Sequence, residues 1–409
     1  MTHGNKERNF FPWKLYFADV FREKGGFDVV IANPPYEQLR DLNDVFQILY
    51  KETKYYQYAK GGRLNLFQFF IPLFSDIARI NAIICAITQN SLLCEDTAKN
   101  NRKFIFENTQ IIKFDSFPER DDIYKRVFFS VKMSVCITLL KNNISEDYSF
   151  SLNIWKERDM ENRRVLNVEK NTIITLFSKK YIIPITDNTS FDLLKRIRLN
   201  DNSFFVSANA GEIDMTKYRP YYSANNSGKR ILTGAQVLRY STTTNPSQGS
   251  VIFLDNVFFN SLSIRRNTVD KKRIVMQRIT GVDSNRRLIM TIIDKGLLCA
   301  NSTNYISKDF EFSLEYVLGL FNSRFINYYF KMTSTNTNIT TSEINSIPIP
   351  VNPGQEYQLI SSLVDRILTA KKANPQADTN ALEAEIDQLV YELYGLTDEE
   401  IEIVEESVG

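Results

Sequence analysis

The stretch Phe27-Asp28-Val29-Val30-Ile31-Ala32, followed directly by Asn33-Pro34-Pro35-Tyr36, decides the fold prediction for this chain of 409 residues. The run from Val29 to Ala32 is continuously apolar, which is typical of a strand covered on both faces. Such strands belong to parallel sheets flanked by helices, and open α/β sheets bind their ligands at the carboxyl ends of the strands. The loop that begins at Asn33 therefore lies at a predicted ligand-binding edge.

The sequence around this stretch continues an α/β pattern. The following elements are expected: two short strands within residues 14–32, a helix over 65–80, a strand at 83–88, a helix near 97–107, and strands near 111–114 and 134–140. From about Asn142 the texture changes to short strand-like pieces separated by polar and glycine clusters, which indicates a second, α+β domain. Further helices are expected over 313–331, 356–371 and 380–394, the last two forming a C-terminal hairpin. We predict domains at residues 1–145, 146–350 and 351–409.

Charge is distributed unevenly along the chain. The whole chain has a net charge of +2, but no Lys or Arg follows Lys372 and eleven acidic residues do, so residues 1–372 carry +13. This much positive charge favours binding of a polyanion such as DNA through contacts with its phosphates. The alternative interpretation is an ordinary solvated basic surface. We expect the acidic end of the hairpin to stay away from DNA by repulsion.

Several classes of protein are disfavoured by composition. The single histidine, His3, lies in a polar start, so a histidine base or a histidine-ligated metal has no residue to use. The four cysteines are scattered without CxxC spacing, which favours buried thiols in a reducing compartment over disulfides or a metal site. No leader pattern or membrane-spanning apolar run is visible. We therefore expect a soluble, cytoplasmic protein without a metal centre or a membrane partner.

The loop at Asn33 has the groups needed to activate an exocyclic amino group such as that of adenine. The Asn33 side-chain oxygen and the Pro34 carbonyl could accept both N–H bonds and aim the nitrogen lone pair at a methyl donor. Pro35 helps to keep backbone carbonyls out of secondary structure, and Tyr36 offers a ring on which an extruded base could stack. A merely rigid turn is the competing interpretation.

The block Phe17-Ala18-Asp19-Val20-Phe21, together with Gly25 to Tyr36, resembles gamma-class, TaqI-like or type IIG adenine-N6 DNA methyltransferases over two consecutive motifs. The resemblance implies a partial Rossmann-like methyltransferase sheet and S-adenosylmethionine as donor, with Asp19 contacting the donor adenine. Val127-Phe128-Phe129-Ser130 is similar to a motif whose aromatic residue packs against the flipped base, so either Phe128 or Phe129 has that role. Residues 232–237, 318–325, 347–350 and 386–397 also resemble this family and its TaqI-like recognition domain.

Members of that family carry a glycine-rich FxGxG loop that grips the methyl donor. No two glycines in this sequence are separated by a single residue, so we doubt that the chain alone binds S-adenosylmethionine. The first strands of the sheet would be missing too, which places Val29–Ala32 near an unpaired edge. Three explanations stay open: a split enzyme completed by a second polypeptide with the FxGxG motif, a remnant that cannot methylate alone, or a DNA-recognition subunit.

Residues 265–287 concentrate positive charge with apolar residues at strand-like spacing, which predicts a phosphate track in which Gln277 or Arg278 reaches a base edge. The candidate DNA contacts are Arg265, Arg266, Lys271, Lys272, Arg273, Gln277 and Arg278. An ordinary solvated face is the alternative. The sequence as a whole predicts an adenine-N6 methyltransferase component of a restriction-modification system that binds duplex DNA and is incomplete alone. The alternative is a non-catalytic specificity subunit or remnant.

Overall fold

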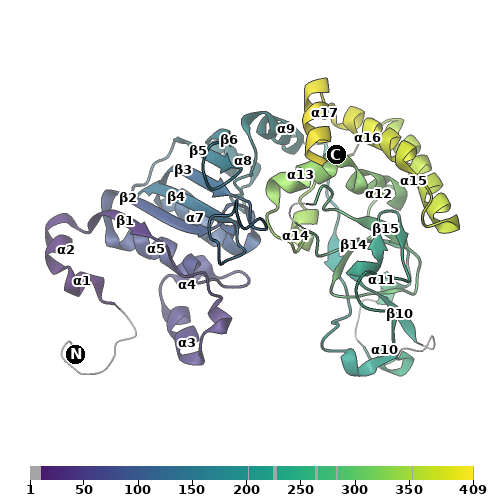
Figure 1. Ribbon diagram of the computed structural model, residues 1–409, viewed down its shortest axis with the longest axis horizontal. Helices are drawn as coiled ribbons and strands as arrows, with labels where there is room; N and C mark the ends of the chain where they lie inside the picture. Colours follow the sequence, from purple (N-terminus) through teal and green to yellow (C-terminus); the bar gives the residue numbers. More distant parts are fainter. Residues whose placement is uncertain are drawn as a thin grey trace. The chain divides into compact units, whose positions relative to one another are not determined.

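The computed structural model describes residues 11–200, 202–223, 228–262, 266–281, 284–351 and 353–408, with only the backbone of Arg266 and Asn267. The chain divides into two compact units, Met1–Phe191 and Asp192–Gly409 (Figure 1). His3 and Arg265, singled out in the sequence, lie outside the described residues. Each unit is described by itself below.

Unit 1 is built on a six-stranded mixed sheet, here called sheet A, with the order β1-β2-β4-β3-β5-β6. Its strands are β1 (Phe27–Ala32), β2 (Ala78–Gln89), β3 (Gln110–Phe117), β4 (Val135–Lys141), β5 (Ser149–Trp155) and β6 (Arg163–Glu169). The pairs β1·β2 and β3·β5 are parallel, and the other neighbours are antiparallel. The α/β fold predicted from the sequence is confirmed, and β5 and β6 continue sheet A beyond residue 145.

The helices of unit 1 follow the order α1 (Trp13–Tyr16), α2 (Ala18–Lys24), α3 (Asp44–Glu52), α4 (Tyr56–Ala59), α5 (Phe67–Ile77), α6 (Ser91–Cys94), α7 (Lys99–Asn108) and α8 (Lys170–Leu176), with α9 (Asn188–Arg198) leading into unit 2. Helices α5 and α7 pack on each other and on sheet A (Figure 1). Both were expected from apolar residues at three- and four-residue spacing. Helix α5 also contains Pro72.

The first of the two strands expected within residues 14–32 is wrong, because that segment forms α1 and α2. A lone strand has no neighbour for its backbone groups, whereas a helix satisfies them within its own segment. Helix α2 ends at Gly25, whose φ of 77° suits glycine. Gly26 follows, and a side chain there would meet the backbone of Ile77 at 2.6 Å. The two glycines thus let the chain turn tightly into β1.

Unit 2 contains several small sheets. The strands are β7 (Ser203–Phe204), β8 (Ala208–Ala210), β9 (Tyr222–Ser223), β10 (Lys229–Leu232), β11 (Val237–Leu238), β12 (Ser241–Thr242), β13 (Ile252–Leu254), β14 (Arg273–Gln277), β15 (Met290–Ile293), β16 (Leu298–Cys299), β17 (Thr303–Ser307) and β18 (Ile349–Pro350). The two larger sheets have the orders β16-β10-β13-β9 and β15-β14-β17-β8. Strand β14 therefore pairs with a neighbour on both sides, and its residues Arg273 to Met276 are buried.

The helices of unit 2 are α10 (Asn256–Ser261), α11 (Arg266–Val269), α12 (Leu314–Asn322), α13 (Arg324–Thr333), α14 (Thr341–Ile344), α15 (Glu356–Ala373), α16 (Asn380–Tyr394) and α17 (Asp398–Val408). The single helix expected over 313–331 is two helices, because the Ser323 side chain accepts a hydrogen bond from the Ile326 amide and starts α13. The expected pair α15 and α16 is present, and α17 follows as a third helix. Among the described helices, none combines the length and apolar character needed to cross a membrane.

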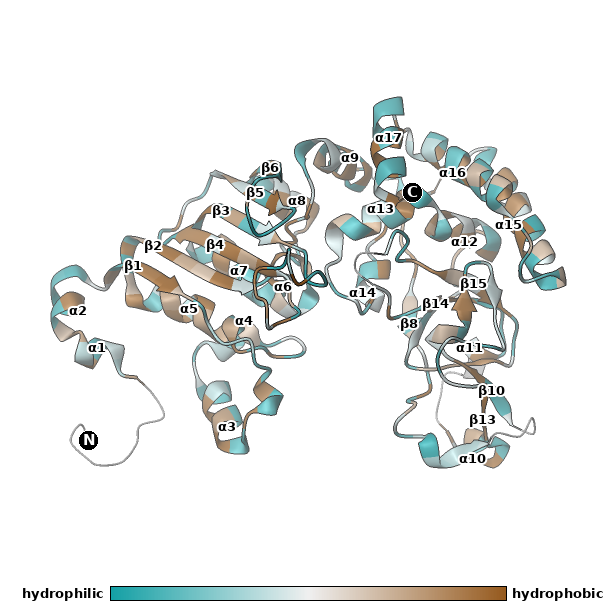
Figure 2. Cartoon of the chain, in the orientation of Figure 1, coloured by the Kyte–Doolittle hydropathy of each residue, from teal (hydrophilic) through white to brown (hydrophobic). Residues whose placement is uncertain are grey.

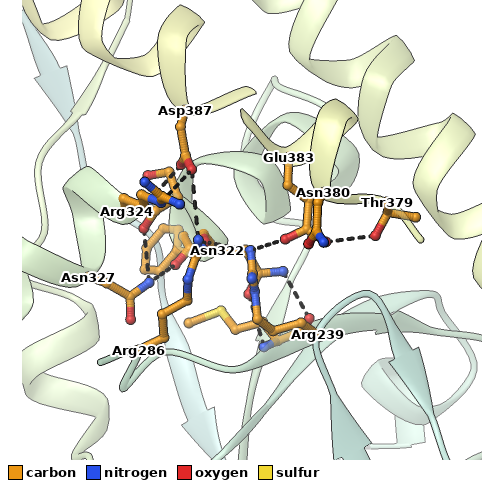
Figure 3. A network of polar contacts seen from close by, with 12 residues as sticks. Arg239, Arg286, Asn322, Arg324, Asn327, Thr379, Asn380, Glu383 and Asp387 are labelled. Atoms are coloured by element: carbon orange, nitrogen blue, oxygen red, sulfur yellow. Dashed lines mark hydrogen bonds and ion pairs between the residues drawn. The ribbon is translucent and has the colours of Figure 1, made fainter. Parts of the chain in front are cut away.

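A buried polar network holds α16 against α12 and α13 (Figure 3). The Asp387 carboxylate, 7% exposed, accepts a hydrogen bond from the Arg324 amide at 2.7 Å and faces the guanidinium groups of Arg324 and Arg286. Glu383 pairs with Arg239 at 2.6 Å. Burial raises the pKa of Asp387, while these donors oppose the rise. The network thus packs one side of the acidic helix α16 into the interior of unit 2.

The acidic C-terminal segment, expected to stay away from DNA, forms ion pairs with basic residues of unit 2. Besides the pairs of α16, Glu400 of α17 lies 2.6 Å from Arg196, and Glu405 pairs with Arg324. Figure 2 shows both hydrophilic and hydrophobic residues along α15, α16 and α17. Several arginines counted in the +13 of residues 1–372 are therefore already neutralised within unit 2.

Candidate substrate site at the end of strand β1

The Asn33-Pro34-Pro35-Tyr36 loop leaves β1 at its carboxyl end, as the sequence predicts. Asn33 and Pro35 are exposed, Pro34 is buried and Tyr36 is half-buried. Because β1 and β2 are parallel, this loop and the end of β2 lie at the same edge of sheet A. The loop therefore presents the exposed side-chain amide of Asn33, next to the buried Pro34.

Hydrogen bonds fix the loop in place. The Tyr36 hydroxyl donates to the Ile87 carbonyl near the end of β2 at 2.8 Å. The Asn65 amide donates to the Tyr36 carbonyl, also at 2.8 Å. Two backbone bonds, from Leu39 to Leu64 and from Leu66 to Glu37, tie the following residues to the segment before α5. The orientation of the Tyr36 ring is therefore set by sheet A rather than by the loop alone.

Phe128 joins Tyr36 at this edge. Their ring centroids are 6.3 Å apart with an interplanar angle of 56°. Phe128 packs with Met133 and Ile137 against a buried cluster formed by Phe117, Val135 and Trp155. Phe129 is 55% exposed and lies under the Arg158 guanidinium, 4.1 Å from its ring centroid. Of the two aromatic candidates that the sequence left open, the structure brings Phe128 to Tyr36.

Asp19 lies on helix α2, outside the Asn33–Tyr36 loop. It lies in the first turn of α2, where its carboxylate is 78% exposed and 2.6 Å from the Arg22 guanidinium. An exposed ion pair of this kind contributes little to the free energy of folding. The Asp19 carboxylate could therefore leave Arg22 and accept a hydrogen bond from a bound ligand instead. The role of Asp19 toward a methyl donor stays a prediction.

The basic segment of unit 2 is divided between interior and surface. Arg273 of β14 is 1% exposed; its guanidinium pairs with Glu212 at 2.7 Å and lies 4.3 Å from the Tyr305 ring centroid. Arg287 is buried too and donates to the Ser334 carbonyl. Residues Arg273 to Met276 of β14 are buried on both faces of the sheet, so they do not form the solvent-facing stripe expected from the sequence. We leave Arg273 out of the proposed DNA contacts.

The remaining candidates keep more access to solvent. Lys271 and Lys272 are exposed, and Lys272 lies 3.8 Å from the equally exposed Asp294. Gln277 donates to the Val237 carbonyl at 2.7 Å, and Arg278 donates to the Asn301 carbonyl at 3.0 Å. Both of these side chains are half-buried and already have a protein partner. The two lysines are therefore the freest cations of the candidate set among the residues with described side chains.

Asn65 is a site residue that sequence reasoning missed. Its side chain donates to Tyr36, and its backbone amide donates to the Gln68 side chain at 2.8 Å. Gln68 in turn donates to the Thr97 carbonyl. A polar pair at the start of an otherwise apolar helix is a weak signal, and only the folded chain brings it to the loop.

The burial of Tyr36 should make the free energy of unfolding depend on pH differently in the wild type and in Tyr36→Phe. Burial raises the pKa of Tyr36 from 10.0 to about 12. The folded-state pKa exceeds the unfolded value, so the contribution is fully present below pH 10 and is lost as pH rises toward 12. The free energy of unfolding of the wild type should therefore fall more steeply above pH 10 than that of Tyr36→Phe. Parallel curves from denaturant titrations would contradict this placement of the phenol.

Two segments of the chain match models of known protein families. Residues 2–124 match the model of the Eco57I restriction-modification methylase, and residues 229–349 match the TaqI-like C-terminal specificity domain. The type IIL restriction-modification enzyme MmeI, solved in complex with DNA, aligns with a TM-score of 0.62 and 11% identity, covering 97% of this chain and 58% of that one. DrdV in its DNA complex aligns with a TM-score of 0.50 and 9% identity, covering 88% and 46%.

The fold, the loop at Asn33 and the two matched segments are all similar to restriction-modification methylases. Residues 229–349 are similar in particular to a TaqI-like C-terminal specificity domain. The resemblance noted in the sequence is thereby confirmed. The chain spans somewhat more than half the length of MmeI and less than half that of DrdV.

Proposed function

We propose that this chain forms the substrate half of an S-adenosylmethionine-dependent DNA methyltransferase that modifies the N6 amino group of adenine. One observation carries the proposal: the Asn33 loop leaves β1 with its amide exposed, beside a Tyr36 ring fixed by the Ile87 carbonyl and adjacent to Phe128. An amide acceptor next to two aromatic rings suits a flat base that carries an amino group. A base inside a duplex cannot reach such a loop, so the target adenine would be extruded.

The proposed chemistry at the substrate site depends on two hydrogen-bond acceptors. The Asn33 side-chain oxygen and the Pro34 carbonyl would accept the two N–H bonds of the amino group. Holding both bonds away from the ring plane draws the nitrogen lone pair out of conjugation and points it in one direction. Tyr36 and Phe128 would hold the base by stacking and edge contacts. Positioning is the main contribution of these residues, because orientation of reacting groups can supply a large part of a rate enhancement.

The glycine spacing supports the proposal that this chain does not bind the methyl donor by itself. The sequence contains no two glycines separated by one residue, and Asp19 is the one residue assigned to the donor by resemblance. We propose that a segment outside residues 1–409 supplies the glycine-rich loop, and that S-adenosylmethionine provides the methyl group once this segment is present. A second polypeptide is one such source.

A methylation assay tests the function. The chain alone should give no stoichiometric S-adenosylmethionine binding by calorimetry. Mixed with a polypeptide that carries the glycine-rich loop, it should transfer labelled methyl groups to duplex DNA, recovered as N6-methyladenine by mass spectrometry. Transfer to cytosine would overturn the adenine assignment. DNA binding that no such polypeptide converts to methylation would favour the alternative, a specificity module without catalysis, which the missing glycine pair also suggests.

The specificity domain supplies the DNA contacts in this proposal. Replacing both Lys271 and Lys272 with alanine should lower the salt dependence of DNA binding. Each lost phosphate contact reduces the slope of log K against log salt by about 0.9, so the pair should remove up to about 2. Fluorescence anisotropy at several salt concentrations measures this slope.

A matched control removes the same charge elsewhere in unit 2. Arg366 and Lys372 are exposed on α15, outside the matched specificity segment. Their double replacement by alanine should leave the slope nearly unchanged. Equal slopes for the two double variants would contradict a specific role for Lys271 and Lys272.

A further inference from the structure

The loop between β3 and β4, residues 118–134, lies at the same edge of sheet A as Asn33. Strand β4 runs antiparallel to both β2 and β3, and β2 is parallel to β1, so β1 and β3 run in the same direction. Both strands therefore end at one edge, where Asn33 follows β1 and Pro118 follows β3. Phe128 of this loop lies with its ring centroid 6.3 Å from that of Tyr36. The β3–β4 loop is thus part of the rim of the candidate substrate site.

A turn in the β3–β4 loop exposes two apolar side chains. The Arg126 amide donates to the Asp122 carbonyl at 3.0 Å and closes this turn. Ile123 and Tyr124 lie inside the turn and are 45% and 78% exposed. Phe129, the next aromatic side chain of the loop in exposure at 55%, lies under a guanidinium group. Tyr124 therefore presents an aromatic ring to solvent at the rim of the site.

Polar contacts hold this turn in one shape. The Glu119 side chain accepts a hydrogen bond from the Asp122 amide at 3.0 Å. The Asp122 carboxylate in turn accepts a hydrogen bond from the Tyr124 amide at 2.9 Å. After the exposed ring, the Lys125 carbonyl accepts a hydrogen bond from the amide of Arg158, which lies between β5 and β6, at 3.1 Å. Because its backbone is already fixed, Tyr124 can bind a partner with little further loss of conformational entropy.

The charges of the β3–β4 loop are compatible with a phosphate backbone. The loop carries four basic and three acidic side chains. Each of the acidic side chains already has a partner: Glu119 and Asp122 accept backbone amides, and Asp121 pairs with Arg120 at 3.4 Å and with Lys132. The ring on this turn can therefore approach DNA without strong repulsion between carboxylates and phosphates.

The size and place of the Tyr124 ring suit the space that an extruded base leaves in a duplex. Base pairs repeat about every 3.4 Å along the axis, so the vacant layer admits one flat ring but not a helix. Tyr124 is four residues from Phe128, so their Cα atoms are at most about 14 Å apart. That distance is comparable with the width of the major groove, about 12 Å. The turn can thus reach the stack while Phe128 and Tyr36 contact the extruded base.

We propose that Tyr124 enters the duplex and stacks in the layer that the extruded adenine vacates. This inference rests on the proposed function, because the layer is vacant only when a base has left the stack. Stacking between a base and an aromatic ring tolerates any sequence, and side chains inserted between bases stabilise unstacked DNA. The β3–β4 loop would then contribute twice to extrusion: Phe128 contacts the base in the site, and Tyr124 replaces it in the duplex.

The test follows extrusion by fluorescence and needs only this chain and DNA. Duplexes that bind the wild type are enriched from a random pool, and 2-aminopurine, whose emission rises when it leaves the stack, then replaces each adenine in turn. The wild type should enhance the emission at one position. Tyr124→Ala should lower the equilibrium constant for extrusion by about tenfold, because one stacking contact is lost. Tyr124→Phe should keep the wild-type value, because it retains the ring.

Ile144→Ala is the matched control. Ile144 is 69% exposed and follows β4, which places it at the opposite edge of sheet A. Its removal should change neither DNA affinity nor emission. Because Tyr124 and Ile144 are both exposed, both alanine variants should unfold at the wild-type temperature.

Each outcome decides the inference. Extrusion that Tyr124→Ala leaves unchanged overturns the inference and spares the proposed function. A loss in Tyr124→Phe as large as that in Tyr124→Ala assigns the effect to the hydroxyl and overturns the inference too. No extrusion by the wild type at any adenine overturns both the inference and the base extrusion of the proposed function. Extrusion that depends on the Tyr124 ring, without methyl transfer in the methylation assay, supports the inference and counts against the proposed function.

Discussion

Replacing Asn33 with alanine is expected to reduce methyl transfer to DNA by about 100-fold or more, the usual effect of losing one hydrogen-bonding group that acts in the transition state. The variant keeps the loop, the Tyr36 anchor on Ile87 and the Phe128 contact, because the Asn33 side chain is exposed and supports none of them. Turnover of labelled methyl groups, measured with the donor-binding polypeptide present, checks the size of the loss. DNA affinity and thermal unfolding should match those of the wild type.

The conservative change Asn33→Asp separates the acceptor from the shape of the loop. A carboxylate oxygen can still accept from the amino group, so part of the activity should return. Full activity of Asn33→Ala would remove the basis of the proposed function. Loss of stability in the alanine variant would instead show that the side chain supports the fold, contrary to its exposure.

Replacing Asp387 with alanine is expected to destabilise unit 2 by about 3–5 kcal/mol, the typical cost of removing one partner from a buried ion pair. The carboxylate is 7% exposed and lies 3.4 Å from the Arg324 Nε and 3.8 Å from the Arg286 guanidinium. Its removal would leave Arg286 facing Arg239 without the shared anion and would free the Arg324 amide at the start of α13. Native-state hydrogen exchange of α16 amides measures the local free energy directly.

Glu385 provides a matched control for this change. It lies two residues away on the same helix, but its side chain is exposed. Glu385→Ala should alter the exchange free energy by no more than about 0.5 kcal/mol. Equal effects of the two substitutions would show that the network of Figure 3 contributes no more than ordinary helix charge.

The spacing of apolar residues predicted helices and strands correctly where the elements that pack against them belong to the same chain. Helices α5 and α7 and strands β2 and β4 formed where the spacing of apolar residues indicated. The pattern failed at residues 14–24, where an apolar, aromatic run was interpreted as a strand and folds as α1 and α2. Strand formation depends on a partner, and the described residues offer none beside β1 on that side.

Residue types and their spacing were enough to predict the loop Asn33 to Tyr36, its place after an apolar strand, and the resemblance to restriction-modification methylases. These features are local, because they depend on residue type and short spacing. Tertiary structure alone decided that Phe128 meets Tyr36, that Arg273 is buried against Glu212, and that Asp387 gathers arginines from α13 and the loop before β15. Burial and pairing depend on which elements become neighbours, and a count of charges along the chain carries no information about that.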